Sequence, residues 1–181
     1  MKRFFLIVLA AVCCLSSCKT SRTYADAERA FRQSLTADDT LEVLIMGQNF
    51  MESLVARDFD SAFEDLSVLY DGVLYRASDK WKSELKSRYS VMCPTEYALS
   101  SYMFSTPGIN DLVYRYSIGT PLSNQGPAFK LALNPVKVEG SWYLTIKDSE
   151  MASEAADHWD EMYPDGPAPA EPKLNRKSET K

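Results

Sequence analysis

The apolar residues of this chain change their spacing once, at Pro94, and this change limits the fold more than any other feature. Before Pro94 they recur every three to four residues, as on an amphipathic helix, and after it they alternate, as on a half-buried strand. Helices followed by antiparallel strands predict an α+β domain with helices packed on one face of the sheet. The length of 181 residues suits one such domain.

Two helices are predicted with clear caps before Pro94. A long helix begins at residues 38–40, where aspartate and threonine side chains can cap it. Another begins after Ser78 and Asp79. Their apolar stripes are Val43, Met46, Phe50 and Leu54, flanked by Met51 and Val55, and Trp81, Leu85 and Tyr89.

The segment between these helices is ambiguous. Asp58 or Asp60 can cap a helix whose apolar stripe is Phe63, Leu66, Leu69 and Tyr70. Residues 68–75 also fit a hairpin around Asp71-Gly72, because Asp-Gly is a frequent two-residue turn. The helical spacing of the apolar residues favours the helix, which is our prediction for 68–75.

Strands are predicted at 97–104, 112–118, 129–133 and 136–147. A turn at 106–108 joins the first two, and a turn at Gly140-Ser141 divides the last segment into a hairpin. Trp142, Leu144 and Ile146 then share one face. A final helix is predicted from Glu150 to Met162.

The N-terminus has the features of an export signal. Lys2 and Arg3 precede an apolar stretch over 4–15, which would span about 18 Å as a helix and is too short to cross about 30 Å of hydrocarbon. It ends in Leu15-Ser16-Ser17-Cys18, which resembles the bacterial lipobox. That resemblance implies cleavage between Ser17 and Cys18 and attachment of diacylglycerol and a further acyl chain, such as palmitate, at Cys18.

The four cysteines have different expected fates. Cys13 and Cys14 leave with the signal peptide, and Cys18 carries lipid. Cys93 is then the one thiol left, so no internal disulfide can form. We interpret Cys93 as a small buried residue, because no histidine lies near it to activate a nucleophile.

The predicted domain organisation has four parts. Residues 1–17 form the lipoprotein signal peptide, and 18–37 form the lipidated cysteine and a flexible tether that can be helical from Tyr24 to Gln33. Residues 38–163 form the α+β domain. Residues 164–181 form a disordered tail, because they are rich in proline and lack aromatic residues.

Two segments resemble a known superfamily. The long helix with "VARDFDSAFEDLS" (Val55 to Ser67) resembles the opening of small NTF2-like (cystatin-like cone) domains, and "NPVKVEGSWYLTIKDS" (Asn134 to Ser149) resembles their closing hairpin. The resemblance implies N-terminal helices on a bent antiparallel sheet that leaves a cone-shaped pocket. It implies fold rather than function, because the superfamily includes dehydratases and isomerases as well as binding and assembly modules. No catalytic motif of its enzymes can be matched here.

An apolar pocket mouth is the predicted ligand site. Tyr114, Tyr116, Phe129 and Trp142 are candidates to line it, and Arg115 or Tyr102 can supply polar contacts. Packing in the core explains the same aromatic residues equally well. For an enzyme, Asp111 and the tyrosines are the nearest titratable groups, and we assign no catalytic residue.

Metal, cofactor and nucleic-acid functions are not predicted. Glu154, His158 and Glu161 share one face of the predicted last helix, but we interpret them as a solvated acidic face rather than a metal site. Residues 58–71 lack the glycine of a calcium loop and are interpreted as helix caps. The net charge of −5 argues against nucleic acid, and a single histidine argues against histidine-based catalysis.

The leading hypothesis is therefore a lipid-anchored cell-envelope protein with a non-catalytic domain that binds a small apolar ligand or a partner protein. One alternative is a pocket enzyme of the hydro-lyase or isomerase type, and another is an assembly or structural subunit of the envelope. Lys19 after the lipidated cysteine, rather than aspartate, favours the outer membrane. The absence of acidic residues over 19–22 favours its periplasmic face.

Overall fold

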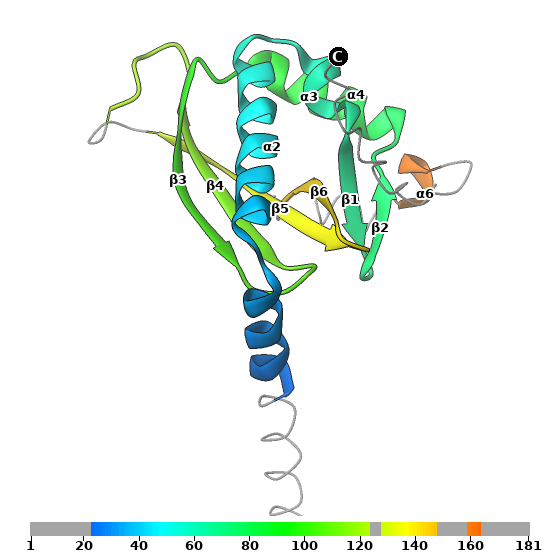
Figure 1. Ribbon diagram of the computed structural model, residues 1–181. Coiled ribbons are helices and arrows are strands. Elements are labelled where there is room, and N and C mark those ends of the chain that lie inside the picture. The colour runs from blue at the N-terminus through cyan, green and yellow to red at the C-terminus, as the bar shows by residue number, and fades with distance from the viewer. Residues whose placement is uncertain (1–22, 124–127, 148–158, 164–181) are drawn as a thin grey trace, which may run out of the picture.

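The computed structural model describes residues 23–123, 128–147 and 159–163 of the chain. The predicted signal peptide, Cys18 and the tail at 164–181 lie outside these residues. One long helix lies along a six-stranded sheet, and residues 23–34 form a second helix that projects from one end (Figure 1). The other helices are α2 (Ala37–Val55), α3 (Phe59–Glu64), α4 (Asp79–Val91) and α6 (Trp159–Met162).

The sheet has the strand order β2-β1-β6-β5-β4-β3. Neighbouring strands are antiparallel except β1 and β6, which are parallel. The α+β class is confirmed, but the purely antiparallel sheet is not. The strands are β1 (Leu66–Tyr70), β2 (Val73–Arg76), β3 (Glu96–Phe104), β4 (Asn110–Ser117), β5 (Phe129–Val138) and β6 (Ser141–Ile146).

The helix predicted over residues 68–75 is wrong, because this segment is the β1–β2 hairpin. Asp71 and Gly72 have φ angles of 48° and 75°, the left-handed values that a two-residue turn requires at both positions. The helix before it, α3, is capped by Asp58 as predicted but ends at Glu64. Leu66 and Leu69 fit a helical spacing by coincidence, and pairing of Leu66 with Leu144 of β6 fixes the strand instead.

Helix α2 begins one turn earlier than its predicted caps. Thr36 is the N-cap, and its side chain accepts a hydrogen bond from the Asp39 amide while the Asp39 carboxylate accepts one from the Thr36 amide. This reciprocal pair is a capping box, which satisfies two amides that the helix start leaves free. The buried residues of α2 include Val43, Phe50 and Leu54, as predicted.

The close packing of α2 on the sheet depends on Gly47. A Cβ atom at this position would lie 2.3 Å from Cδ2 of Leu112 and 2.7 Å from Oη of Tyr114. Leu112 and Tyr114 lie on β4, and both side chains are buried. The helix backbone therefore rests directly on β4, with no space between the two elements at this level.

The elements on either side of Pro94 follow the prediction. Ser78 caps α4, and Trp81, Leu85 and Tyr89 of this helix are buried. Strands β3 and β4 pair around the predicted turn at 106–108, with a bulge between Leu99 and Ser101. Strand β5 runs through Pro135 as one strand rather than two segments, and the turn to β6 is made by Glu139 and Gly140.

The segment predicted as a flexible tether needs correction at its end. Residues 23–34 are helical, in agreement with the helix expected from Tyr24 to Gln33. Phe31 is buried, and its ring meets that of Trp142 at an edge-to-face angle of 61° with centroids 6.4 Å apart. An aromatic residue in the core cannot belong to a free tether, so the domain boundary moves from Asp38 to include Phe31.

The C-terminal end of the described chain packs on the β1–β2 hairpin. The ring of Trp159 stacks on Tyr70 with centroids 4.0 Å apart, and Tyr163 donates a hydrogen bond to the Arg76 carbonyl. Helix α6 therefore packs beside β1 and β2 (Figure 1). Residues 150–158 of the predicted last helix lie outside the described residues.

We predict that Gly47→Ala destabilises the domain although alanine is the better helix former. The new methyl group would press on Leu112 and Tyr114, and overpacking of this kind costs about 1–3 kcal/mol. Urea unfolding followed by tryptophan fluorescence measures the effect. The matched control is Asn49→Ala on the exposed side of α2, for which we expect no loss. Equal stability of the two variants would show that α2 does not rest on β4.

Candidate functional site

The six predicted ligand-site residues do not form one pocket. Their strand positions place five on the sheet face that α2 covers and Arg115 on the opposite face, because side chains alternate along β4. The buried residues of this set are Tyr114, Tyr116 and Trp142, the exposed ones are Tyr102 and Phe129, and Arg115 is intermediate.

Tyr114 and Trp142 are core residues rather than pocket walls. Trp142 is fully buried, and the Tyr114 hydroxyl lies under the backbone of α2 at Gly47. Burial, and to a smaller extent neighbouring Tyr97, raises the pKa of Tyr114 to about 12. The phenol is therefore neutral at physiological pH and a poor source of protons for acid–base chemistry.

The other predicted residues point to different surroundings. Tyr116 stacks on Phe129 with ring centroids 5.4 Å apart, and half of Phe129 remains exposed. Arg115 donates a hydrogen bond of 3.0 Å to the carbonyl of Ser123. Tyr102 lies on the outermost strand, β3, and is 47% exposed. The two contacts fix local packing, and together with Tyr102 these side chains do not converge on a common ligand site.

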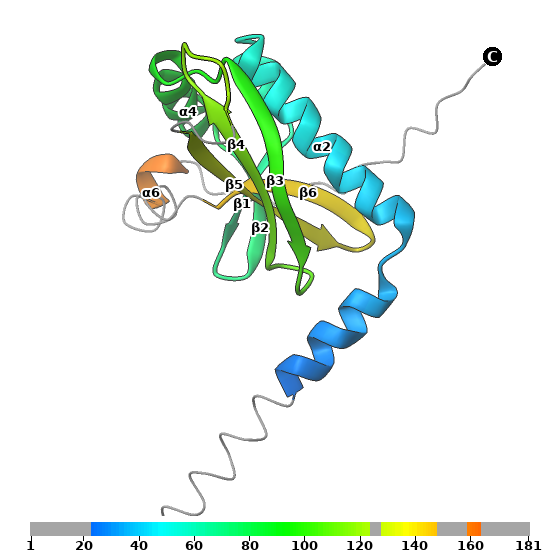
Figure 2. The same ribbon diagram turned by 90° about the vertical axis from the view of Figure 1, so that its left-hand side faces the viewer.

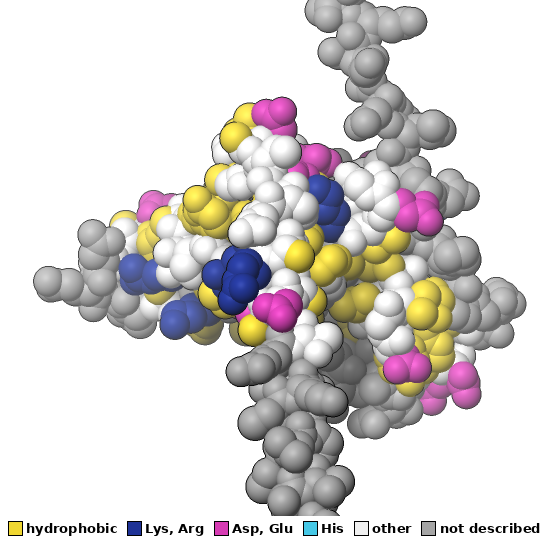
Figure 3. Space-filling model, turned by 60° about the horizontal axis from the view of Figure 1, so that its bottom comes forward, with side chains coloured by type: hydrophobic (Ala, Val, Ile, Leu, Met, Phe, Trp, Pro, Cys, Tyr) yellow, Lys and Arg dark blue, Asp and Glu magenta, His cyan; other side chains and the backbone are white. Residues whose placement is uncertain are grey.

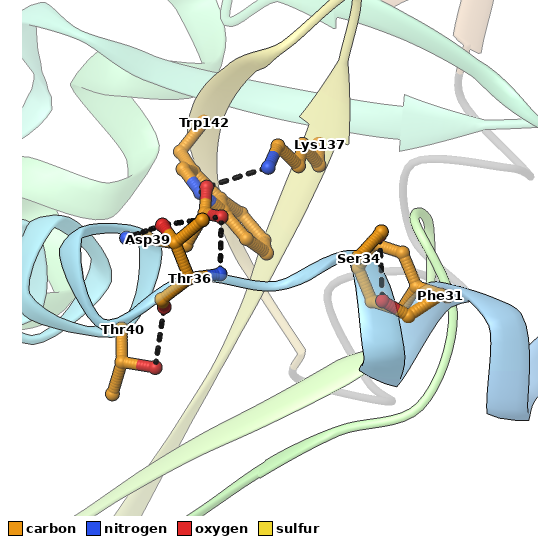
Figure 4. Close-up of polar contacts among 7 residues, drawn as sticks. All are labelled: Phe31, Ser34, Thr36, Asp39, Thr40, Lys137 and Trp142. Carbon is orange, nitrogen blue, oxygen red and sulfur yellow. Dashed lines mark hydrogen bonds and ion pairs between the residues drawn. The ribbon is translucent and has the colours of Figure 1, made fainter.

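The most highly organised polar site is one that the sequence does not identify. Oδ1 of Asp39 accepts hydrogen bonds from Nζ of Lys137 at 2.5 Å and from Nε1 of Trp142 at 2.9 Å (Figure 4). Its other oxygen accepts from the amide and the hydroxyl of Thr36 at 2.9 and 3.0 Å. We call Thr36, Asp39, Lys137 and Trp142 the Asp39 cluster. It joins the start of α2 to the β5–β6 hairpin.

The electrostatics of the Asp39 cluster oppose a catalytic role. Burial raises the pKa of the Asp39 carboxyl, but hydrogen bonds from Lys137, Thr36 and Trp142 outweigh burial and hold the pKa well below its usual range. A carboxylate with four donors is a weak base, because proton uptake would cost these hydrogen bonds. Only 12% of the Asp39 side chain and 19% of the Lys137 side chain is exposed. The cluster therefore has a structural role, which is to link the start of α2 to the β5–β6 hairpin.

Aromatic residues close the end of the sheet beside the Asp39 cluster. Phe31 and Phe104 both pack on Trp142, with ring centroids 6.4 and 5.5 Å from it. Nε of Arg32 donates a hydrogen bond of 2.8 Å to the Phe104 carbonyl, which holds the helix of residues 23–34 against the end of β3. Figure 4 shows Phe31 on this helix, next to the Asp39 cluster.

Part of the Asp39 cluster has a sequence signal. Thr36 and Asp39 have the spacing of a capping box, a threonine followed three residues later by an acidic residue. Lys137 and Trp142 flank the predicted turn at Gly140 and so pair across the hairpin. The link between Asp39 and Lys137 spans 98 residues and follows only from tertiary packing.

Other candidate sites remain structural or untested. The described residues contain no group of three or more His, Cys, Asp or Glu side chains that could hold a metal ion. Glu161 of the acidic face pairs with Lys80, while Glu154 and His158 lie outside the described residues. Asp111 pairs with Lys147 at 2.7 Å. Cys93 is buried and donates to the Leu54 carbonyl, which agrees with its interpretation as a small core residue.

Comparison of the chain with protein-family models, with curated protein sequences and with solved structures found no match in any of the three. Within residues 23–123, 128–147 and 159–163, no helix combines the length and the apolar character needed to cross a membrane. The function of the chain therefore has to be argued from its own residues.

We predict that Asp39→Asn destabilises the domain by about 2 kcal/mol at pH 7, because Lys137 loses its charged partner while remaining mostly buried. The lowered pKa of Asp39 stabilises the fold above the ordinary carboxyl pKa of about 4, and this stabilisation is lost as the pH falls further. The difference between wild type and Asp39→Asn should therefore shrink below about pH 4. Urea unfolding across this pH range measures it.

The control for this prediction is Asp38→Asn, which removes the neighbouring exposed carboxylate of the same helix turn. We expect it to cost only the few tenths of a kcal/mol that an acidic residue near a helix start contributes. If both variants have the same stability at pH 7, the Asp39 cluster does not tie α2 to the sheet.

Proposed function

We propose that this chain is a lipid-anchored protein of the bacterial cell envelope whose α+β domain binds a partner protein without catalysing a reaction. The single observation that carries the choice of partner over ligand is the filled interior. Gly47 brings α2 onto β4, and Leu112, Leu133 and Trp142 beneath it are fully buried. A small molecule in this place would have to displace core side chains.

The proposal of an NTF2-like fold rests on the order and arrangement of the helices and strands. The long helix α2 lies along the sheet, and the short helix α3 and the β1–β2 hairpin follow it in the chain. The last four strands, β3 to β6, are neighbours in the sheet in chain order. A bent sheet around a helix is what the resemblance of residues 55–67 and 134–149 implies. In an NTF2-like fold the cone-shaped pocket would lie between helix and sheet, where this chain has buried side chains such as Tyr114 and Trp142.

The proposal of a lipid anchor rests on the N-terminal sequence. The basic residues, the short apolar stretch and the sequence before Cys18 agree with a lipoprotein signal. Several acyl chains at about 0.8 kcal/mol per buried methylene would give a lasting attachment. Lys19 supports the outer membrane, and the lack of acidic residues over 19–22 supports its periplasmic face. On the end from which residues 23–34 project, basic, acidic and hydrophobic side chains are intermingled (Figure 3), so the visible surface there offers no large basic patch as a substitute anchor.

We predict that cells fed with labelled palmitate incorporate the label into the wild-type chain and not into Cys18→Ala. The reason is that Cys18 is the cysteine that directly follows the expected cleavage site of lipobox type. Gel autoradiography of the immunoprecipitated protein measures the label, and Cys93→Ala is the matched control, which should remain labelled. Equal labelling of wild type and Cys18→Ala would contradict the anchor.

We predict that native mass spectrometry of the full chain, released from detergent micelles, gives the mass of the protein with its lipids and no further bound molecule. This follows from the filled interior between α2 and β4. A stoichiometric small molecule that survives desalting would contradict the partner-binding function and restore the ligand hypothesis.

A further inference from the structure

Strand β3 is a long sheet edge that no other described strand covers, although Arg32 donates to the Phe104 carbonyl at its end. It is the last strand in the sheet order, and seven of its nine residues are exposed. Leu99, Tyr102 and Met103 are 43%, 47% and 49% exposed. No described strand pairs with its outer edge, so main-chain donors and acceptors there are open to another strand.

The edge has a bulge between Leu99 and Ser101, but from Tyr97 to Ser105 it lacks two other features that normally prevent pairing. Natural edge strands carry charged residues or proline, which block the approach of another strand. From Tyr97 to Ser105 the sequence is YALSSYMFS, with neither a charge nor a proline. In an acidic chain of net charge −5 such a neutral stretch is where a second backbone can approach without repulsion.

An apolar shelf on α2 lies beside this edge. The Tyr97 hydroxyl donates to the Glu52 carboxylate at 3.4 Å, which shows the side of α2 that faces β3. Helix and strand run in opposite directions (Figures 1 and 2), so residues earlier in α2 lie level with residues later in β3. On this side of α2, Leu41 is 56% exposed and Leu44 is half-buried.

The strand residues that face this shelf follow from the register. Leu99 pairs with Tyr114 and, after the bulge, Tyr102 pairs with Leu112, so both point to the α2 side of the sheet. We call Leu41, Leu44, Leu99 and Tyr102 the β3–α2 surface. A strand added to β3 would turn every second side chain toward the α2 side of the sheet, where this surface lies.

Two carboxylates near the start of β3 determine which charge on a partner segment would be attracted to the β3–α2 surface. Glu52 accepts hydrogen bonds from Gln48 and Tyr97, and Glu96 accepts one from the Leu122 amide. In the described part of the chain neither carboxylate has a cationic partner within 4.0 Å. Both lie where β3 begins, so a cation on the incoming segment would be attracted to this end.

We propose that the edge of β3 and the β3–α2 surface bind an extended segment of a partner protein, with apolar residues at alternate positions and a lysine or arginine at the end where Glu52 and Glu96 lie. The segment pairs with β3 through its main chain and packs its apolar side chains on Leu99, Tyr102 and Leu41. This inference rests on the proposed partner-binding function and specifies its surface and its partner.

The test uses the full lipidated chain in detergent and fluorescent nine-residue peptides of alternating valine and threonine, flanked by lysine or by glutamate at both ends. We expect saturable binding of the lysine peptide, at least about tenfold tighter than that of the glutamate peptide. Methylation of every second backbone nitrogen of the lysine peptide should abolish binding in the register that blocks the amides facing β3 and spare it in the other register, because only the amides that face β3 donate to it.

Variants of the chain locate the site. Leu99→Lys should weaken the lysine peptide at least about tenfold, whereas Val91→Lys, an equally apolar-to-charged change on exposed α4, should have no effect. Glu52→Gln with Glu96→Gln should abolish the preference for lysine over glutamate. Circular dichroism confirms that each variant is folded.

The proposal is contradicted if the lysine peptide does not bind saturably, if backbone methylation has no effect, or if Leu99→Lys and Val91→Lys behave alike. If one of these results is found and the native mass spectrum shows no bound molecule, only the proposed binding at the β3–α2 surface is contradicted. A bound small molecule in that spectrum overturns the proposed function itself, so the two failures are distinguishable.

Discussion

The contact between the backbone of α2 and the side chains of β4 at Gly47 determines what this domain can hold. Any residue other than glycine would place a Cβ atom within 3 Å of Leu112 and Tyr114. Because the helix rests on β4, the sheet face beneath it is filled by large aromatic and aliphatic side chains. The same architecture with a larger gap between helix and sheet would enclose a pocket. We therefore propose that binding takes place outside, along the open edge of β3.

The Asp39 cluster explains how the start of α2 is held in this position. A carboxylate that accepts from Lys137, Trp142 and Thr36 is costly to bury but is fully hydrogen-bonded, so it specifies one geometry. Phe31 packs on the same Trp142 from the preceding helix. The helix of residues 23–34 is therefore joined to the domain by packing of Phe31.

Sequence reasoning succeeded where one physical signal was sufficient. The change of apolar period at Pro94 predicted the α+β class, and Ser78 and Asp58 predicted helix starts that the structure confirms. It failed at residues 68–75, where two signals conflicted. The helical spacing of Leu66 and Leu69 was given more weight than the Asp71-Gly72 turn, but left-handed turn geometry is the more specific signal.

The site could be predicted less well than the fold, for a physical reason. Alternation along a strand shows which residues share a face but not whether that face is filled or hollow, so Tyr114 and Trp142 fitted a pocket and a core equally. The pairing of Asp39 with Lys137 joins residues that are 98 positions apart, so it depends on the path of the whole chain between them. The sequence could not predict the exposed edge of β3 either, because only the strand order shows that β3 lies at an edge of the sheet.

The central claim is that this domain binds on its outside, at β3, and not in its interior. Hydrogen–deuterium exchange of the full chain in native membranes and after purification tests it most directly, because strand addition protects main-chain amides. We predict slower exchange in membranes for peptides that cover Glu96–Phe104, with unchanged exchange in α2 and β4. Unchanged exchange in β3, or a change confined to α2 and β4, would contradict the account.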